Sequence, residues 1–118
     1  NLDTVYQQSD YISLHTPLTD ETKGMINSGA IAKMKQGVRI INTCRGQVII
    51  EEDVAKALES GKIAGYAADV FYAEPPENSP LLKAPHTILT PHIGASTEEN
   101  LPRLGDCIVD RVSKFVSR

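Results

Sequence analysis

Four short apolar runs recur along this chain, and segments with a helical pattern separate them. We predict β-strands at residues 10–15, 38–43, 63–70 and 87–90. Strands that alternate with helices are typical of an α/β fold with a mostly parallel sheet. The runs are apolar at consecutive positions, as expected where helices cover both faces of a sheet. The sequence therefore predicts a parallel sheet of about four strands with helices on both faces.

The helical segments have recognisable ends. We expect helices at residues 2–8, from Asn27 to about 35, at 51–60 and at about 97–115. Asn27 suits an N-cap, and Gly37 and Gly61 suit helix stops. Residues 71–85 hold four of the seven prolines and are expected to form a long loop, the proline loop. In the last helix, apolar residues at helical spacing predict one buried face. They are Leu101, Leu104, Ile108, Val112 and Phe115.

The composition argues against several classes of protein. The chain has 118 residues, which favours one small domain, and its formal charge is −3. It has no basic cluster that would suit nucleic acid, and no apolar run approaches the roughly 18 residues of a membrane helix. The first residues lack the basic and apolar parts of a signal peptide. Cys44 and Cys107 have no metal-binding or redox spacing, so we expect no metal site and a reduced, cytoplasmic setting.

Polar residues follow the ends of the expected strands. In open α/β sheets, ligands bind beyond the carboxyl ends of the strands. Residues far apart in sequence can therefore meet in one crevice. The groups at these ends are His15-Thr16-Pro17, Thr43-Cys44-Arg45-Gly46, Asp69 and His92. For the first group, a strand end turned by Pro17 is the simpler explanation.

Several of these residues suit chemistry, although each also has a structural explanation. Arg45 has a planar fork that suits a carboxylate, or it pairs with a nearby acid at the surface. Asp69 either caps a turn, which is the commoner case, or accepts a hydrogen bond from a ligand amide. If Glu74 reaches His92 from its proline loop, it favours the charged imidazole and fixes the ring tautomer. A His–Glu pair that faces an arginine suits proton transfer beside a bound carboxylate.

The order of several motifs resembles one known family. The motifs are "SDYISLHTPLTDETKGMIN", "GVRIINTCRGQVIIEEDVAKALESGKIAGYAADVFYAEPP", "SPLL" and "ILTPHIGAST". Together they resemble the D-isomer-specific 2-hydroxyacid dehydrogenases. "EPPENSPLL" and "HIGAST" are most similar to the D-3-phosphoglycerate dehydrogenase branch, which implies a place in serine biosynthesis. The resemblance implies half of a doubly wound, Rossmann-type domain that takes part in hydride transfer between NAD and a D-2-hydroxy acid.

The resemblance also implies roles for particular residues. Arg45 would bind the substrate carboxylate and polarise the reacting carbonyl. His92 would be the acid/base, and Glu74 would hold it oriented and charged. Asp69 would contact the nicotinamide carboxamide. Other cofactor contacts would come from His15, Thr16, Pro17, Thr43, Cys44, Arg45, His92, Ile93, Gly94 and Ala95, with His15 and Pro17 near the adenine.

The dinucleotide fingerprint of this fold is absent from the sequence. The fingerprint is G-x-G-x-x-G, and no two of the eight glycines are separated by a single residue. The family's substrate-binding domain is absent as well. We therefore interpret residues 1–118 as a single partial dinucleotide-binding domain, with weak or no NAD binding and little activity by itself. Ile50 stands where the family has an acid or an asparagine.

Two classes of function remain open. The intact set of Arg45, Glu74 and His92 favours an enzymatic parent that acts on a small 2-hydroxy or 2-oxo acid. The missing glycine loop favours the alternative, a non-catalytic folding or interaction module, or an NAD-sensing corepressor-like protein. The Tyr11–Leu14 strand leaves an open apolar edge, and such edges invite association. We therefore expect a homodimer formed through this edge or through bare helix faces.

Overall fold

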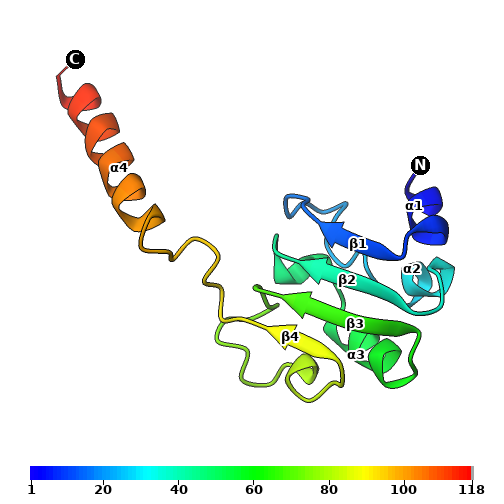
Figure 1. The fold of residues 1–118 in the computed structure, drawn as a ribbon. Coiled ribbons are helices and arrows are strands. Elements are labelled where there is room, and N and C mark those ends of the chain that lie inside the picture. The colour runs from blue at the N-terminus through cyan, green and yellow to red at the C-terminus, as the bar shows by residue number, and fades with distance from the viewer. Residues whose placement is uncertain (118) are drawn as a thin grey trace.

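The centre of the computed structural model, which describes residues 1–117, is a parallel sheet of four strands. The strands are β1 (Tyr11–Leu14), β2 (Val38–Asn42), β3 (Ile63–Ala68) and β4 (Thr87–Leu89), and they lie side by side in this order (Figure 1). Every neighbouring pair of strands is parallel. The prediction of an α/β fold with a parallel sheet is confirmed, and the carboxyl ends of the strands share one edge.

Helices occur close to the expected positions. They are α1 (Leu2–Gln8), α2 (Ser28–Lys33), α3 (Glu51–Glu59) and α4 (Asn100–Val116), with short 3₁₀ turns η1 (Gly46–Val48) and η2 (Pro80–Leu82). Asn27 caps α2 as predicted, because its side-chain oxygen accepts the Ala30 N–H at 3.0 Å. Gly61 follows the C-cap of α3 with a φ of 74°, a left-handed conformation that glycine adopts without steric cost.

The core lies between one face of the sheet and the helices α2 and α3. Apolar side chains from the strands, from the helices and from the segment after η1 meet there, and their burial is the main free energy that holds these elements together. The most deeply buried are Ile26, Val38, Ile40, Val48, Ile49, Val54, Leu58, Ile63, Tyr66 and Leu81.

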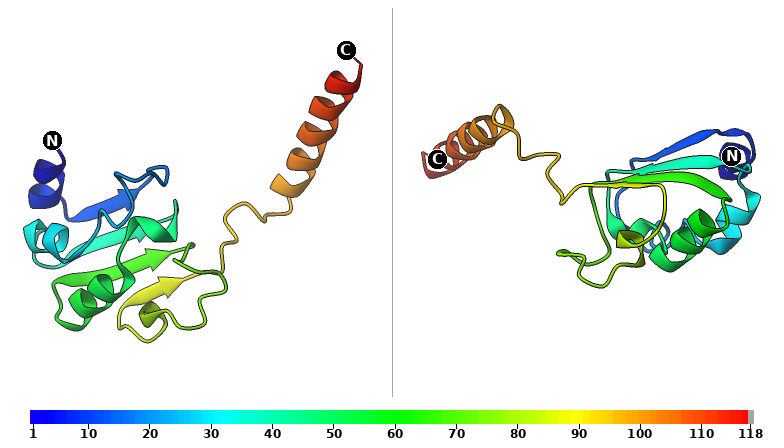
Figure 2. Two further views of the ribbon diagram at one scale, coloured as in Figure 1. Left: turned by 180° about the vertical axis from the view of Figure 1, so that it is seen from behind. Right: turned by 60° about the horizontal axis from the view of Figure 1, so that its bottom comes forward.

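The opposite face of the sheet is open. Burial alternates along β1, where Ile12 and Leu14 are buried and Tyr11 is 63% exposed. Ile88 of β4 is 73% exposed. Figure 2 shows α2 and α3 on the same side of the sheet. The structure thus differs from the expectation of helices on both faces, because within residues 1–117 no helix packs on this second face.

Helix α4 extends away from the sheet (Figures 1 and 2). None of its described residues is buried, and the five apolar residues at helical spacing, Leu101 to Phe115, are between 47% and 78% exposed. The radius of gyration is 17.4 Å, against about 13.5 Å for a compact domain of this length. The expected buried face on this helix is therefore wrong: the spacing is helical, but nothing in residues 1–117 packs against it. No helix in the described range, α4 included, is long and apolar enough to cross a membrane.

Candidate active site

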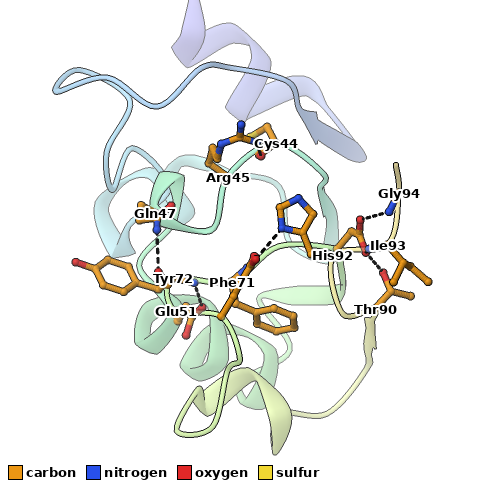
Figure 3. A network of polar contacts seen from close by, with 12 residues as sticks. Cys44, Arg45, Gln47, Glu51, Phe71, Tyr72, Thr90, His92, Ile93 and Gly94 are labelled. Carbon is orange, nitrogen blue, oxygen red and sulfur yellow. Dashed lines mark hydrogen bonds and ion pairs between the residues drawn. The ribbon is translucent and has the colours of Figure 1, made fainter. Parts of the chain in front are cut away.

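Asp69, just after β3, holds the turn that carries His92. Its Oδ1 accepts the Thr90 hydroxyl at 2.6 Å and the Ile93 N–H at 2.9 Å, and its Oδ2 accepts the Gly94 N–H at 2.8 Å (Figure 3). A Cβ on residue 94 would lie 3.0 Å from Oδ2, so glycine permits this close approach. Asp69 therefore acts as a turn cap, which is the commoner of its two explanations.

The surroundings of Asp69 also keep it charged. Desolvation acts to raise the pKa of this carboxyl, but hydrogen bonds from Thr90, Ile93 and Gly94 outweigh it, and the pKa is lowered. An ionised carboxylate has about four acceptor positions, and the turn uses three of them. Acceptor capacity therefore remains for a ligand amide.

His92 has an uncommon backbone conformation. Its φ is 57°, in the left-handed region that costs a residue on the order of 1–3 kcal/mol. Histidine is one of the residues found there more often than average. The N–H groups of the next two residues, Ile93 and Gly94, are bonded to Asp69, so the turn is kept in this shape.

The imidazole of His92 is paired with Glu74. His92 Nδ1 lies 2.7 Å from Glu74 Oε2, and Glu74 Oε1 accepts the Phe71 N–H at 3.1 Å. The hydrogen bond with His92, followed by that from Phe71, lowers the pKa of Glu74. The two side chains are 48% and 38% exposed, so a ligand can reach the pair. Because Nδ1 faces a carboxylate, Nε2 is the ring atom left to exchange a proton.

Buried Asn42 fixes the loop that carries Arg45. The Asn42 side chain accepts the Cys44 N–H at 3.1 Å and donates to the Arg45 carbonyl at 3.0 Å. A Cβ on Gly46 would lie 1.9 Å from the carbonyl of Phe71, so only glycine fits beside Arg45. The exposed guanidinium donates through Nη1 to the Cys44 carbonyl at 2.6 Å. Its other N–H groups remain available to a ligand.

Arg45, Glu74 and His92 line one cavity of about 190 Å³. The three residues named as catalytic from the sequence thus surround one space, although they come from three separate segments. A larger cavity of about 450 Å³ lies between the start of α3 and the proline loop, and no histidine, cysteine or basic residue lines it. The smaller cavity is the candidate active site because it combines an acid/base pair with a cation.

The other predicted cofactor residues lie outside this cavity, along the same edge of the sheet. His15, Thr16 and Pro17 follow β1, and β1 is separated from β4 by two strands. At about 4.8 Å between neighbouring strands, β1 and β4 are about 14 Å apart. Thr16 Oγ1 is buried without a hydrogen-bond partner. The segment after β2 carries Thr43 and Cys44. The segment after β4 carries Ile93, Gly94 and Ala95.

Two residues that shape the site escaped the sequence patterns. Asn42 is fully buried, and Thr90 donates to Asp69. Asn42 had a usable signal, because a polar amide that closes an apolar strand must find partners when it is buried. Thr90 had none, because its partner lies 21 residues away. No three His, Cys, Asp or Glu side chains in residues 1–117 cluster closely enough to hold a metal ion.

Comparison with known proteins identifies the family. The profile of the D-isomer specific 2-hydroxyacid dehydrogenase NAD-binding domain matches residues 1–94. The chain belongs to this family. The resemblance noted from the sequence is confirmed, and so is NAD as the cofactor that the family binds. This family therefore supplies the context in which the edge of the sheet is interpreted.

Individual relatives agree with this assignment. The chain is 47% identical over 111 residues to D-3-phosphoglycerate dehydrogenase of Bacillus subtilis, covering 94% of this chain and 21% of the relative. It is 46% identical over 117 residues to hydroxypyruvate reductase of Thermotoga maritima, covering 97% and 38%. The chain thus spans between about a fifth and two fifths of the length of these two relatives.

Solved structures confirm the Rossmann-type fold. A D-lactate dehydrogenase from Aquifex aeolicus, complexed with NAD and lactic acid, matches with a TM-score of 0.91 at 36% identity, over 98% of this chain and 40% of that chain. An NAD-dependent formate dehydrogenase from Staphylococcus aureus, in complex with NAD, matches with a TM-score of 0.92 at 32% identity, over 98% and 35%. Because nearly the whole chain aligns, α4 is part of both matches.

Proposed function

We propose that residues 1–118 are the C-terminal half of the cofactor-binding domain of an NAD-dependent dehydrogenase that interconverts a D-2-hydroxy acid and a 2-oxo acid. The observation that carries the proposal is the cavity lined by Arg45, Glu74 and His92, with the His92–Glu74 contact at 2.7 Å. This reaction needs a cation that binds the substrate carboxylate and, beside it, an oriented acid/base.

The residues divide the reaction between them. Arg45 binds the substrate carboxylate with a forked pair of hydrogen bonds and polarises the reacting oxygen. In oxidation, Nε2 of His92 takes the hydroxyl proton while the carbon loses a hydride and the C=O bond forms; reduction returns the proton. Glu74 accepts the Nδ1–H and stabilises the imidazolium that results. Bound NAD supplies the acceptor for the hydride.

The chain offers polar groups for the two ends of NAD but not the glycine pattern for the pyrophosphate between them. Asp69 retains acceptor capacity beside His92, which suits the nicotinamide carboxamide, and the unpartnered Thr16 Oγ1 lies at the distant end of the same edge. The glycine pattern that would bind the pyrophosphate does not occur among these residues. We therefore propose that the 118-residue chain binds NAD weakly and has little activity alone.

For the substrate, we propose D-3-phosphoglycerate or a similar acid, as in the D-3-phosphoglycerate dehydrogenase branch. The support is the pair of motifs "EPPENSPLL" and "HIGAST". Identity alone does not favour it, since the reductase relative scores 46% against 47% for the dehydrogenase. Steady-state assays of the parent enzyme with D-3-phosphoglycerate and with hydroxypyruvate would distinguish the two branches.

Titration of the chain with NADH, followed by the fluorescence of the nicotinamide, tests the proposal for the isolated chain. We expect no saturation below millimolar NADH, because the pyrophosphate pattern is missing, and micromolar binding would contradict the proposed weak binding.

In the parent enzyme, His92→Ala should lower kcat by about 10²- to 10⁴-fold with little change in cofactor affinity. An unchanged kcat would remove His92 from the mechanism, and binding without any turnover in the unmodified parent would favour the non-catalytic alternative.

A further inference from the structure

Glu51, the first residue of α3, is a buried carboxylate outside the cavity of the proposed active site. It is 8% exposed, and only Asn42 joins it among the buried polar side chains of residues 1–117. Its Oε1 accepts the Tyr72 N–H at 2.8 Å, and its Oε2 accepts the Ser79 hydroxyl at 2.7 Å. Both partners lie on the proline loop, so one side chain contacts this loop at two points.

The proline loop carries Glu74 between those two points. Tyr72 is held from both sides, because its N–H bonds to Glu51 and its carbonyl accepts Gln47 Nε2 at 2.8 Å (Figure 3). Gln47 follows Arg45 by two residues. The segment that carries Arg45 is thus joined by a side-chain hydrogen bond to the loop that carries Glu74.

We propose that Glu51 is a positioning residue for this site: by fixing Tyr72 and Ser79, it holds Glu74 at the distance and angle that His92 requires. The proposal rests on the proposed function for its catalytic meaning. A buried carboxylate is costly unless its hydrogen bonds are satisfied, and an apolar residue would fill the same space more cheaply. Two directional acceptors aimed at two points of one loop are what an apolar residue cannot supply.

A simple helix-stabilising role is the alternative. Acids in the first turn of a helix interact favourably with its dipole, and Glu52 also lies in the first turn of α3 but is exposed. Glu52→Gln therefore serves as the matched control, since it removes one first-turn charge without touching the loop. Glu51→Ala removes both contacts with the loop, and Glu51→Gln restores the shape and part of the hydrogen bonding.

The test is NMR titration of the 118-residue chain. The Glu74 side-chain ¹³C signal reports its pKa, and the His92 ring ¹⁵N signals report the tautomer. In Glu51→Ala we expect the lowered pKa of Glu74 to rise toward its ordinary value and the ring to become a mixture of tautomers. Glu51→Gln should lie between that variant and the wild type, and Glu52→Gln should match the wild type. A folded Glu51→Ala with both signals unchanged would overturn the proposal.

Gln47→Ala and Ser79→Ala cover the case in which Glu51→Ala fails to fold, because each removes a single hydrogen bond to or from the loop and leaves the Glu51–Tyr72 contact in place. Each variant should raise the pKa of Glu74 by a smaller amount than Glu51→Ala, and an unchanged pKa in both variants would overturn the proposal. In the parent enzyme, Glu51→Ala should lower kcat by roughly 10- to 100-fold at a nearly constant KM. If the parent turns over no hydroxy acid but the NMR shifts occur, the proposed function fails and the positioning role stands.

Discussion

At the scale of single residues, Asp69 determines the position of His92. It receives three hydrogen bonds from the segment around His92, and two of them come from the N–H groups directly after the left-handed residue. A conformation that costs on the order of 1–3 kcal/mol persists only where its surroundings enforce it. Turn capping and ligand binding, which compete as explanations from the sequence, are thus compatible roles of one carboxylate.

Replacement of Asp69 should change how stability depends on pH. The pKa values of Asp69 and Glu74 are lowered in the folded chain, so their ionised forms stabilise it above the ordinary carboxyl range. This contribution is lost as the pH falls through that range, from about 4, toward the lowered values. Urea unfolding should therefore show stability falling less steeply between about pH 5 and 3 in Asp69→Asn than in the wild type.

Asp69→Asn should also lower the free energy of unfolding at pH 7, by about 1–3 kcal/mol, because hydrogen bonds to a charged acceptor are lost. The control is Asp106→Asn on exposed α4, which should keep the wild-type pH dependence. Equal slopes for Asp69→Asn and the wild type would contradict the capping role.

At the scale of elements, α3 begins without a side-chain cap. Ile50 is the N-cap residue and has no side-chain acceptor, so no capping side chain accepts from the first N–H groups of the helix. Asp53, in the first turn, instead accepts the Ser28 N–H at 2.7 Å and thereby supports the start of α2. The acid or asparagine that the family resemblance implies at position 50 would supply the missing acceptor.

Ile50→Asp should therefore stabilise α3. Relative to Ile50→Ala, we expect the free energy of unfolding to rise by about 0.5–2 kcal/mol. The comparison with alanine is needed because Ile50 is 37% exposed and packs beside Gly24, so both variants lose the same apolar contact. Chemical denaturation of the two variants measures the difference, and equal midpoints and slopes would show that the cap is not formed.

The elements were predictable from local pattern, but many of the contacts between them were not. The strands at 38–43 and 63–70 and the cap at Asn27 follow from apolar runs and short-range chemistry, and the structure has them within two residues. Arg45, Asp69 and His92 could be found because strand ends in a parallel sheet meet at one edge. Gln47 and Glu51 could not, because their partners lie 21 to 28 residues away along the chain.

At the scale of the whole molecule, α4 and the open face of the sheet leave large apolar side chains in solvent. Phe115 is 78% exposed and Ile88 is 73% exposed. The solved relatives that align with α4 are more than twice as long as this chain, which covers 35–40% of them. The apolar spacing of α4 predicted that the helix has an apolar face, but the spacing carries no information about whether other residues cover that face.

For the isolated chain, we expect association into a homodimer through these surfaces. Sedimentation at tens of micromolar should show a dimer, since exposed apolar patches of this kind favour association. The double variant Leu104→Ser/Ile108→Ser should shift the distribution toward monomer. Arg103→Ser/Asp110→Ser, on the same helix, is the matched control and should not. A well-folded monomer of the wild-type chain at this concentration would count against the dimer.

The hydrogen bonds around Arg45, Glu74 and His92 all fall within residues 42–94. On the proposed function, the groups that move a proton thus lie in one contiguous stretch, which contains no G-x-G-x-x-G pattern for the dinucleotide. Chemistry and cofactor affinity would then occupy separate lengths of polypeptide. Mutations that change the affinity for the coenzyme would then leave the reacting groups undisturbed.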